Sequence, residues 1–434
     1  MSKYGRKLNP FRSLRDPLGV KGIRQSVVVT NNPSTINQNE QLLVRFPNLG
    51  DQDVIVPGTA RLAFTISLTS TDDNRTVVQN LGRAIVKKTT IKISGNEVAS
   101  VEDSDVINCY SDLWKTKRER QAHVYQGIDA NSTAANALKL RVGADDGVGT
   151  VARDKAIADA YGNRFCIPLD FELLESHMPF YQSALGGRLE YELTFNGYSR
   201  VIKATGDTNA SYAINNISLE FDVVREPNLA RQIRSKYAGR LAILYDRVLR
   251  HRKLTYNKSD SLWNINLNVP TRSLKGILAL FEDAGTATAF ARDTESFYNP
   301  KIEKVEVTIE GVPNQLYSQG MRAYQQWDEA KKYFAGGPSA KRHPAVAAVA
   351  KDLGLADVTV GEYLTTKYAL WLDMRTTDDD SLHGSGRRVE NASEGVTIQI
   401  AKKVEAAGVL NAYLYVIMDA QLNIENGQFV HALY

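Results

Sequence analysis

The sequence predicts an all-β protein that contains two β-sandwiches or jelly rolls in tandem and a few short helices. Three observations carry this prediction. Alternating segments rich in β-branched residues, each ending at turn formers, recur along the whole chain. A chain of 434 residues is long for a single hydrophobic core. One segment also occurs twice, about half a chain length apart, which indicates that the two sandwiches are related.

In the first half, the two-residue period predicts strands at 26–30, 41–46, 60–70, 89–95, 187–197 and 212–224. The last of these segments has apolar residues largely on one face and acidic residues on the other, as in a half-buried antiparallel strand. Its apolar face comprises Ile214, Ile217, Leu219, Phe221 and Val223. The period becomes helical after Pro227, which predicts a helix over 228–239.

In the second half, the same argument predicts strands at 241–249, 262–270, 274–283, 305–311, 363–374, 395–403 and 410–424. Two further helices are predicted at 106–120 and 320–334. Long loops are predicted at 126–163 and 335–360. Insertions of that length in an all-β protein are usually functional or face a partner.

The repeated segment reads "NLGRAIVKKTTIKISGNEV" at 80–98 and "NPKIEKVEVTIEGVPNQLY" at 299–317. Aligning Gly95 with Gly311 places Ile93 on Ile309, and each copy precedes a helix that carries aromatic residues. We therefore expect the two glycines to occupy equivalent turns, each with a positive φ.

The charge of the chain is concentrated at its start. Residues 1–25 carry seven basic side chains against the single acid Asp16, whereas the whole chain has a net charge of only +4. A frayed, solvated terminus is one interpretation. The other is an assembly arm that docks onto an acidic partner, a membrane surface or nucleic acid. The basic residues of this arm are Lys3, Arg6, Lys7, Arg12, Arg15, Lys21 and Arg24.

The motifs of common enzyme classes are missing from the sequence. The six histidines include no pair at the helical spacing of a zinc site, and Cys109 and Cys166 form no CxxC motif. There is neither a GxSxG elbow nor a phosphate-binding loop. We therefore expect no enzymatic activity, cofactor or metal. Two cysteines in so long a chain indicate a reducing compartment, and neither a signal-peptide core nor a membrane-spanning run is predicted.

The remaining candidate binding or catalytic sites each have an ordinary structural explanation. "HGSGRR" at 383–388 could cradle an anion but is more typical of a loop, and "TTDDDS" at 376–381 is more typical of a solvated turn than of a cation site. A glycosidase on a β-sandwich would need paired carboxylates, for which Asp170, Glu172, Glu190 and Glu192 are the candidates, although salt bridges on the solvent side explain them equally well. Core or interface anchoring explains the four tryptophans, which are Trp114, Trp263, Trp327 and Trp371.

Five segments, in order, resemble the double-jelly-roll, hexon-like major capsid proteins of polinton-like and adintovirus-type elements. Residues 80–120 resemble a strand, glycine turn and helix of the first jelly roll, and "IPLDFELLESHMPFYQSALGGRLEYELTF" resembles its later strand pair. "SLWNINLNVPTRSLKGILALFEDA" resembles the start of the second jelly roll, Asn299, Pro300 and Ile302 match an NP-x-I signature, and "YLYVIMDAQLNIENGQFVHALY" is similar to the closing strand.

The resemblance implies a double jelly roll with an arm at 1–25, a first jelly roll at 26–227, a helical connector at 228–240 and a second jelly roll at 241–434. It implies a major capsid protein whose homotrimers are pseudo-hexameric and tile an icosahedral virion capsid. The implied partners are neighbouring capsomers, penton and minor capsid proteins, with an internal membrane or packaged DNA as the contact of the arm. Assembly would occur in the reducing host cytoplasm or nucleus. The alternative is a tandem β-sandwich module for carbohydrate binding or adhesion, which would be expected to carry a secretory signal.

Overall fold

The chain forms two compact units, which are described separately. The first comprises the described parts of residues 1–105, 123–245 and 420–433, and the second those of 106–122 and 246–419. The boundary falls within strand β13 (Arg240–Asn257), after Tyr245, and within strand β22 (Val409–Glu425), after Asp419. The structure, a computed structural model, describes residues 23–30, 33–56, 58–69, 76–115, 124–128, 164–169, 187–203, 211–237, 240–287, 292–317, 319–334, 358–376, 385–390, 395–425 and 428–433.

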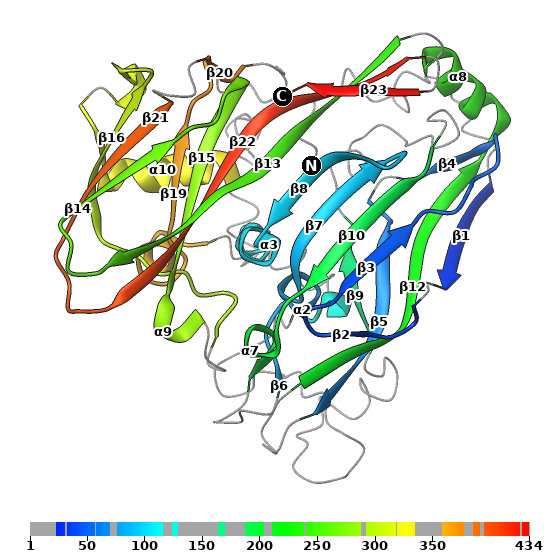
Figure 1. The fold of residues 1–434 in the computed structure, drawn as a ribbon, viewed down its shortest axis with the longest axis horizontal. Coiled ribbons are helices and arrows are strands. Elements are labelled where there is room, and N and C mark those ends of the chain that lie inside the picture. The colour runs from blue at the N-terminus through cyan, green and yellow to red at the C-terminus, as the bar shows by residue number, and fades with distance from the viewer. Residues whose placement is uncertain are drawn as a thin grey trace. The chain divides into compact units, whose positions relative to one another are not determined.

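The first unit contains two large antiparallel sheets (Figure 1) and a small one formed by β6 (Thr76–Val77) and β11 (Ile202–Lys203). One large sheet follows the order β1 (Ile23–Thr30), β12 (Ser211–Arg225), β5 (Arg61–Thr69) and β9 (Arg164–Pro168), with β2 (Ile36–Asn37) and β4 (Asp53–Ile55) also paired to β12. The other large sheet follows the order β3 (Gln41–Arg45), β10 (Leu189–Phe195), β7 (Val86–Ile93) and β8 (Asn96–Glu102). The remaining elements are α2 (Leu81–Ala84), η2 (Val124–Gln126), α7 (Tyr198–Val201) and α8 (Pro227–Tyr237).

The second unit repeats this arrangement. Its first sheet follows β13, β22, β15 (Thr271–Asp283) and β19 (Ala369–Asp373), with β20 (Arg387–Val389) on β15. β23 (Gln428–Leu433) pairs with the end of β22 that belongs to the first unit. Its second sheet follows β14 (Leu262–Leu267), β21 (Val396–Lys402), β16 (Ile302–Ile309) and β17 (Val312–Pro313), with β18 (Met321–Arg322) on β16. The remaining elements are α3 (Ser104–Leu113), α9 (Ala284–Ala287), η4 (Gln315–Tyr317), α10 (Ala323–Phe334) and α13 (Val360–Thr365).

The two units share one strand order. In chain order, the eight main strands are β1, β3, β5, β7, β8, β9, β10 and β12 in the first unit and β13, β14, β15, β16, β17, β19, β21 and β22 in the second. In both units, one sheet contains the first, eighth, third and sixth of these strands in that order, and the other contains the second, seventh, fourth and fifth. The eight-stranded pattern in two sheets is that of a jelly roll. The predicted all-β fold with two tandem jelly rolls is therefore confirmed.

The turn that follows β7 recurs after β16, as the repeated segment predicts. Ile93 pairs with Asn96 across a two-residue turn, and Ile309 pairs with Val312 across another. Both residues of each turn have a positive φ: 53° and 79° in Ser94 and Gly95, and 50° and 77° in Glu310 and Gly311. Two positive φ angles define the turn type that matches the twist of a hairpin and favours glycine at its second position.

The core of the first unit is built from residues at alternate positions along its strands. In β10, every second residue from Leu189 to Phe195 is buried. In β12, Ile214 and Ile217 are both fully buried although they lie three positions apart, an odd spacing that would place them on opposite faces of a regular strand. A bulge at Asn216, which has a φ of 52° and lies in a register shift, returns both side chains to the same face.

The first sheet of the second unit is buried on both faces. Nearly every residue of β15 and β22 is buried, as is all of β19, which explains why these segments are almost continuously apolar. On one face, Tyr333 of α10 stacks on Trp371 at a centroid distance of 3.9 Å. Gly276 makes room for that indole, because a Cβ atom there would lie 2.2 Å from Trp371 Cη2.

Several sequence predictions need correction. The predicted strand at 363–374 begins as a helix, because Thr359 and Glu362 form a capping box that starts α13, and the strand proper starts only at Ala369. Strands β8, β9 and β23 were not predicted. The helix predicted at 106–120 is α3, which starts at Ser104 and ends at Leu113. Most of the predicted loops at 126–163 and 335–360 lies outside the described residues.

Candidate functional site

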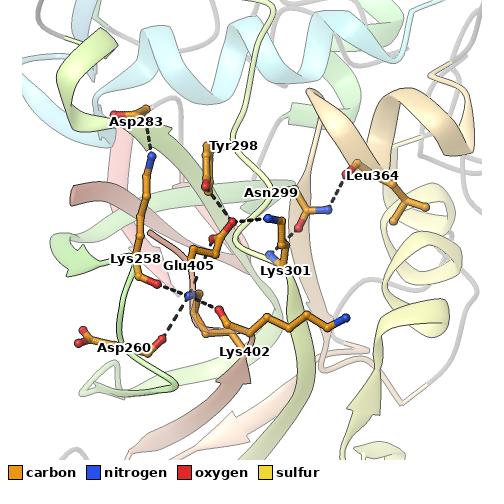
Figure 2. A network of polar contacts seen from close by, with 10 residues as sticks. Lys258, Asp260, Asp283, Tyr298, Asn299, Lys301, Leu364, Lys402 and Glu405 are labelled. Atoms are coloured by element: carbon orange, nitrogen blue, oxygen red, sulfur yellow. Dashed lines mark hydrogen bonds and ion pairs between the residues drawn. The ribbon is translucent and has the colours of Figure 1, made fainter. Parts of the chain in front are cut away.

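A polar network joins several strand connections of the second unit (Figure 2). It links the β13–β14 turn at 258–261, the segment before β16 at 298–301, the β21–β22 loop at 403–408, and helix α13. We call it the loop-end network and define it by Lys258, Tyr298, Lys301, Lys402 and Glu405.

Lys402 is the most buried member of the loop-end network. It ends β21, where Val396, Ile398, Ile400 and Lys402 occupy alternate buried positions. Its side chain is 0% exposed. Its Nζ donates hydrogen bonds to three carbonyl oxygens, those of Lys258 (2.7 Å), Asp260 (3.2 Å) and Lys403 (2.6 Å). The lysine therefore lies as a cation inside a cage made by two loops.

Two features of its surroundings shift the pKa of Lys402 in opposite directions. Burial lowers the pKa of its ammonium, and the carboxylate of Glu405, whose Oε2 lies 3.9 Å from Nζ, raises it in part. The indole of Trp263 lies 5.3 Å from Nζ and adds a cation–π contact.

Glu405 receives two further donors. Its Oε1 accepts from Tyr298 Oη at 3.0 Å and pairs with Lys301 Nζ at 2.7 Å. Burial, followed by the hydrogen bond to Glu405, raises the pKa of Tyr298 to about 12. The phenol therefore stays protonated at neutral pH, so it serves as a hydrogen-bond donor and not as a nucleophile.

Lys258 connects the two loops through its backbone and its side chain. Its amide donates to Gly408 O at 2.9 Å, and its own carbonyl accepts from Glu405 N at 3.1 Å. Its ammonium forms an ion pair with Asp283 and lies 4.3 Å from the ring centre of Tyr298. Burial alone would raise the pKa of Asp283, but the contact with Lys258 outweighs it and lowers that pKa.

The NP-x-I signature positions this network. Asn299 Oδ1 accepts from Lys301 N at 2.8 Å, which closes a turn, and Lys301 has a φ of 56°. Asn299 Nδ2 donates to Leu364 O at 2.7 Å, which ties α13 to the same segment. Ile302 is buried. The signature thus fixes a turn and docks a helix, and the whole arrangement is suited to holding loops rigid.

An aromatic cluster lies elsewhere in the second unit. Trp114, which follows α3, stacks on Trp327 at 5.6 Å and on Phe334 at 5.5 Å, and Tyr110 of α3 meets Phe297 edge-on at 5.0 Å. The hydroxyl of Tyr110 donates to Lys367 O at 3.1 Å. A segment from the first half of the sequence therefore completes the core of the second unit.

The tryptophans are more closely associated than their sequence positions suggest. The same cluster continues through Phe334 and Tyr333 to Trp371, so three tryptophans predicted to lie in separate elements are connected. Trp114, Trp263 and Trp371 are buried, as expected of core anchors.

Of the predicted assembly-arm residues, only Arg24 is described. It lies on β1 opposite Val224, and its Nε is 2.8 Å from Asp222 Oδ2. The other six lie outside the described residues: Lys3, Arg6, Lys7, Arg12, Arg15 and Lys21.

The weaker sequence candidates lie in ordinary structural roles where they are described. Glu190 pairs with Arg45 at 2.8 Å, and Glu192 pairs with Lys92 at 2.6 Å, as predicted for solvent-side salt bridges. Asp170, Glu172 and most of "TTDDDS" lie outside the described residues. The end of "HGSGRR" forms β20.

The described part of the chain offers little for metal binding or for helices that span a membrane. There, no group of three or more His, Cys, Asp or Glu residues could hold a metal ion, and no helix is long and apolar enough to cross a membrane. The thiols of Cys109 and Cys166 are buried, and burial raises the pKa of Cys166 to about 12.

Apart from its NP-x-I turn, the loop-end network was not predicted from the sequence. One signal could have found Lys402: the alternation of "VTIQIAK" places this lysine on the buried face of its strand. The partners of Lys402 are backbone carbonyls, which no residue type marks in a sequence.

No protein-family model matches the chain, and no curated protein sequence matches it. Solved structures match it over nearly its full length. VP54 of PBCV-1, in a crystal structure fitted into a cryo-EM reconstruction of the virophage Sputnik, has a TM-score of 0.61 and 12% identity, over 96% of this chain and 97% of that one. The Faustovirus major capsid protein has a TM-score of 0.57 and 9% identity, over 94% and 91% of the two chains. The mavirus major capsid protein has a TM-score of 0.52 and 10% identity, over 94% and 90%. Together with the strand order repeated in both units, these likenesses identify the fold of the chain as a double jelly roll.

Proposed function

We propose that this chain is a structural major capsid protein whose trimers tile an icosahedral viral shell. The observation that carries the proposal is the repetition of one eight-stranded order in both units of a single chain. The match to VP54 of PBCV-1 over almost the whole of both chains supports it, as do the matches to two major capsid proteins. These neighbours do not favour the adhesion alternative.

The physical argument concerns symmetry. Two similar lobes in one chain, placed three times around a threefold axis, present six similar lobes, and such a tile packs on a flat facet. Closed threefold symmetry also limits the growth of the trimer itself, while its outer edges supply weaker contacts between capsomers. A duplicated sandwich therefore provides a pseudo-hexameric tile from one gene product.

The proposal includes the finer assignments. The jelly rolls would span 26–227 and 241–434, joined by the helical connector at 228–240, and the viral type would be polinton-like or adintovirus-like. Partners would be neighbouring capsomers, penton and minor capsid proteins in the virion. Two cysteines in a chain of this length suit assembly in a reducing cytoplasm or nucleus. The proposed role is structural and not enzymatic.

Light scattering on the purified full chain tests the proposal. We expect a single species of three times 48.1 kDa, and electron microscopy of any larger species should show pseudo-hexagonal tiles. A stable monomer at micromolar concentration and physiological salt would refute the trimeric capsomer.

A further inference from the structure

Strand β1 forms an exposed edge of the first sheet of the first unit (Figure 1). All eight of its residues pair with β12 on one side, and no described strand pairs with it on the other. None of its residues is buried, and Ile23 and Val28 are 71% and 63% exposed. An antiparallel edge strand directs about half of its backbone N–H and C=O groups away from the sheet.

The first sheets of the two units have three other outer strands, which are β9, β13 and β19. These strands are better protected from solvent than β1. At the opposite edge from β1, the middle residues of β9 are buried, and the equivalent β19 is buried throughout. The strand equivalent to β1 in the second unit, β13, buries Tyr245 and Asp246. Among the residues of these outer strands whose burial is described, the exposed large apolar side chains are Ile23 and Val28, both on β1.

The sequence of β1 lacks the usual protection of an edge strand. Soluble proteins guard such edges with charges, proline or bulges. Residues 25–30, "QSVVVT", contain no charge, proline or glycine and have three consecutive valines. The one charged residue of the strand, Arg24, is engaged by Asp222. This composition is typical of a segment that accepts another strand.

We propose that the outer edge of β1 pairs antiparallel with β1 of a second copy of this chain, so that two first-unit sheets become continuous between neighbouring capsomers. The inference rests on the proposed capsid function, which brings many copies together. Antiparallel pairing of identical strands is self-complementary around a twofold axis. Because residues 25–30 carry no charge, their pairing brings no like charges together.

The size of the contact suits a lattice and not a free dimer. Two strands of eight residues bury far less than the roughly 1,200–2,000 Å² of a stable interface. One such contact is therefore weak and reversible, and it becomes effective only when a capsomer makes several at once.

The segment before β1 is the rival occupant of this edge. Residues 1–22 contain Pro10, Pro17 and three glycines, and they carry six basic residues against one acid. Proline and glycine disfavour a paired strand. The observations therefore favour a second β1.

The test compares two full-length variants. Val28→Lys places a charge on the edge, and Val404→Lys is the matched control, because Val404 is 64% exposed and lies outside any strand. Both variants should keep the trimer mass and melting temperature of the wild type. Only Val28→Lys should lower the yield of larger assemblies, by about tenfold, because each contact then faces two lysines.

The outcomes separate this inference from the capsid proposal. If wild type forms no trimer and no larger assembly, the capsid proposal fails. If wild type assembles and Val28→Lys assembles equally well, only the β1 inference is overturned. A synthetic peptide of residues 23–30 should also inhibit assembly of the wild type, whereas a scrambled peptide should not. Inhibition by a peptide of residues 1–22 in its place would assign the edge to the arm and refute the pairing of two β1 strands.

Discussion

Single residues in this protein are constrained mainly by the backbone groups that they satisfy. Lys402 is an example, because its ammonium is removed from water yet donates to three carbonyl oxygens and lies beside a carboxylate. Burying an unpaired charge is costly, but a buried charge whose hydrogen bonds are all made can be retained. The residue therefore contributes through the loop carbonyls that it joins.

Replacing Lys402 tests that role. Lys402→Met keeps most of the side-chain volume but removes the donor shared by three part-buried carbonyl oxygens, of which only that of Lys258 also accepts from Glu405 N. We expect the unfolding free energy of the second unit to fall by about 3 kcal/mol. Calorimetry can measure the loss, with the neighbouring Lys403→Met as control, since that side chain is 65% exposed and its loss should cost no more than about 0.5 kcal/mol. Equal melting temperatures for the two variants would contradict the role given to the carbonyl cage.

Asp53 provides a prediction about pH. Hydrogen bonds from Arg225, at 2.8 and 3.2 Å, lower the pKa of this carboxyl below its ordinary value, although burial acts in the opposite direction. A carboxyl with a lowered folded-state pKa stabilises the protein above its unfolded-state pKa of about 3.9, and this contribution disappears as the pH falls through the folded-state value.

Asp53→Asn should therefore melt below the wild type at pH 7, and the two melting temperatures should converge as the pH falls below the ordinary aspartate pKa of about 3.9. Melting temperatures recorded from pH 7 to pH 2.5 measure this. A difference between the two proteins that stays constant over that range would show that the charge of Asp53 is not responsible.

At the scale of elements, the sequence predicted half-buried strands and also the long, almost fully buried strands β15 and β22. β10 and β21 alternate buried and less buried residues, and both were predicted within two residues of their bounds. β9 was missed because "RFCIP" buries three consecutive residues and has no alternation. α13 was missed because its apolar residues resemble a strand, while its start depends on the hydrogen bonds between Thr359 and Glu362.

The repeated turns give a prediction at this scale. Gly95 has a φ of 79°, and a Cβ atom added there would meet nothing within 4 Å, so only backbone conformation opposes a side chain. Gly95→Ala should cost about 1 kcal/mol of unfolding free energy. Gly361→Ala is the matched control, because Gly361 lies in α13 with equally open surroundings, and alanine in a helix should be neutral or stabilising by up to about 1 kcal/mol. Chemical denaturation can compare them, and effects of the same sign and size would argue against a strained turn.

At the scale of the whole molecule, the duplicated fold was predictable but the way that its parts are assembled was not. The half-chain repeat and the strand periods were sufficient to predict two tandem β-sandwiches or jelly rolls. They could not predict that Tyr110 and Trp114, from the first half, pack with Phe297 and Trp327 in the second unit. Such contacts depend on long-range packing, which leaves no period in a sequence. The same limit applied to the loop-end network, whose partners come from several strand connections.

The basic arm belongs to this scale, because its expected effect is on the assembly and not on the fold. Since β1 begins at Ile23, a deletion of residues 2–22 leaves every described strand intact. We expect the shortened chain to keep the wild-type trimer mass and to melt within about 2 °C of the wild type, while the yield of closed shells falls. A second variant, with glutamine at the six basic positions of residues 1–22, keeps the length of the arm and removes only its charge.

Electron microscopy and light scattering of the two variants distinguish what the arm contacts. If charge is responsible, both variants should lose shells equally, and wild-type assembly should weaken with salt, steeply if the partner is DNA. Binding of the wild type to anionic vesicles would instead favour a membrane, where each basic residue contributes roughly 1 kcal/mol. If the glutamine variant assembles normally and the deletion does not, the arm acts through its chain and not its charge. If the deletion prevents folding or trimer formation, residues 2–22 belong to the folded capsomer, and the assignment of an assembly arm is wrong.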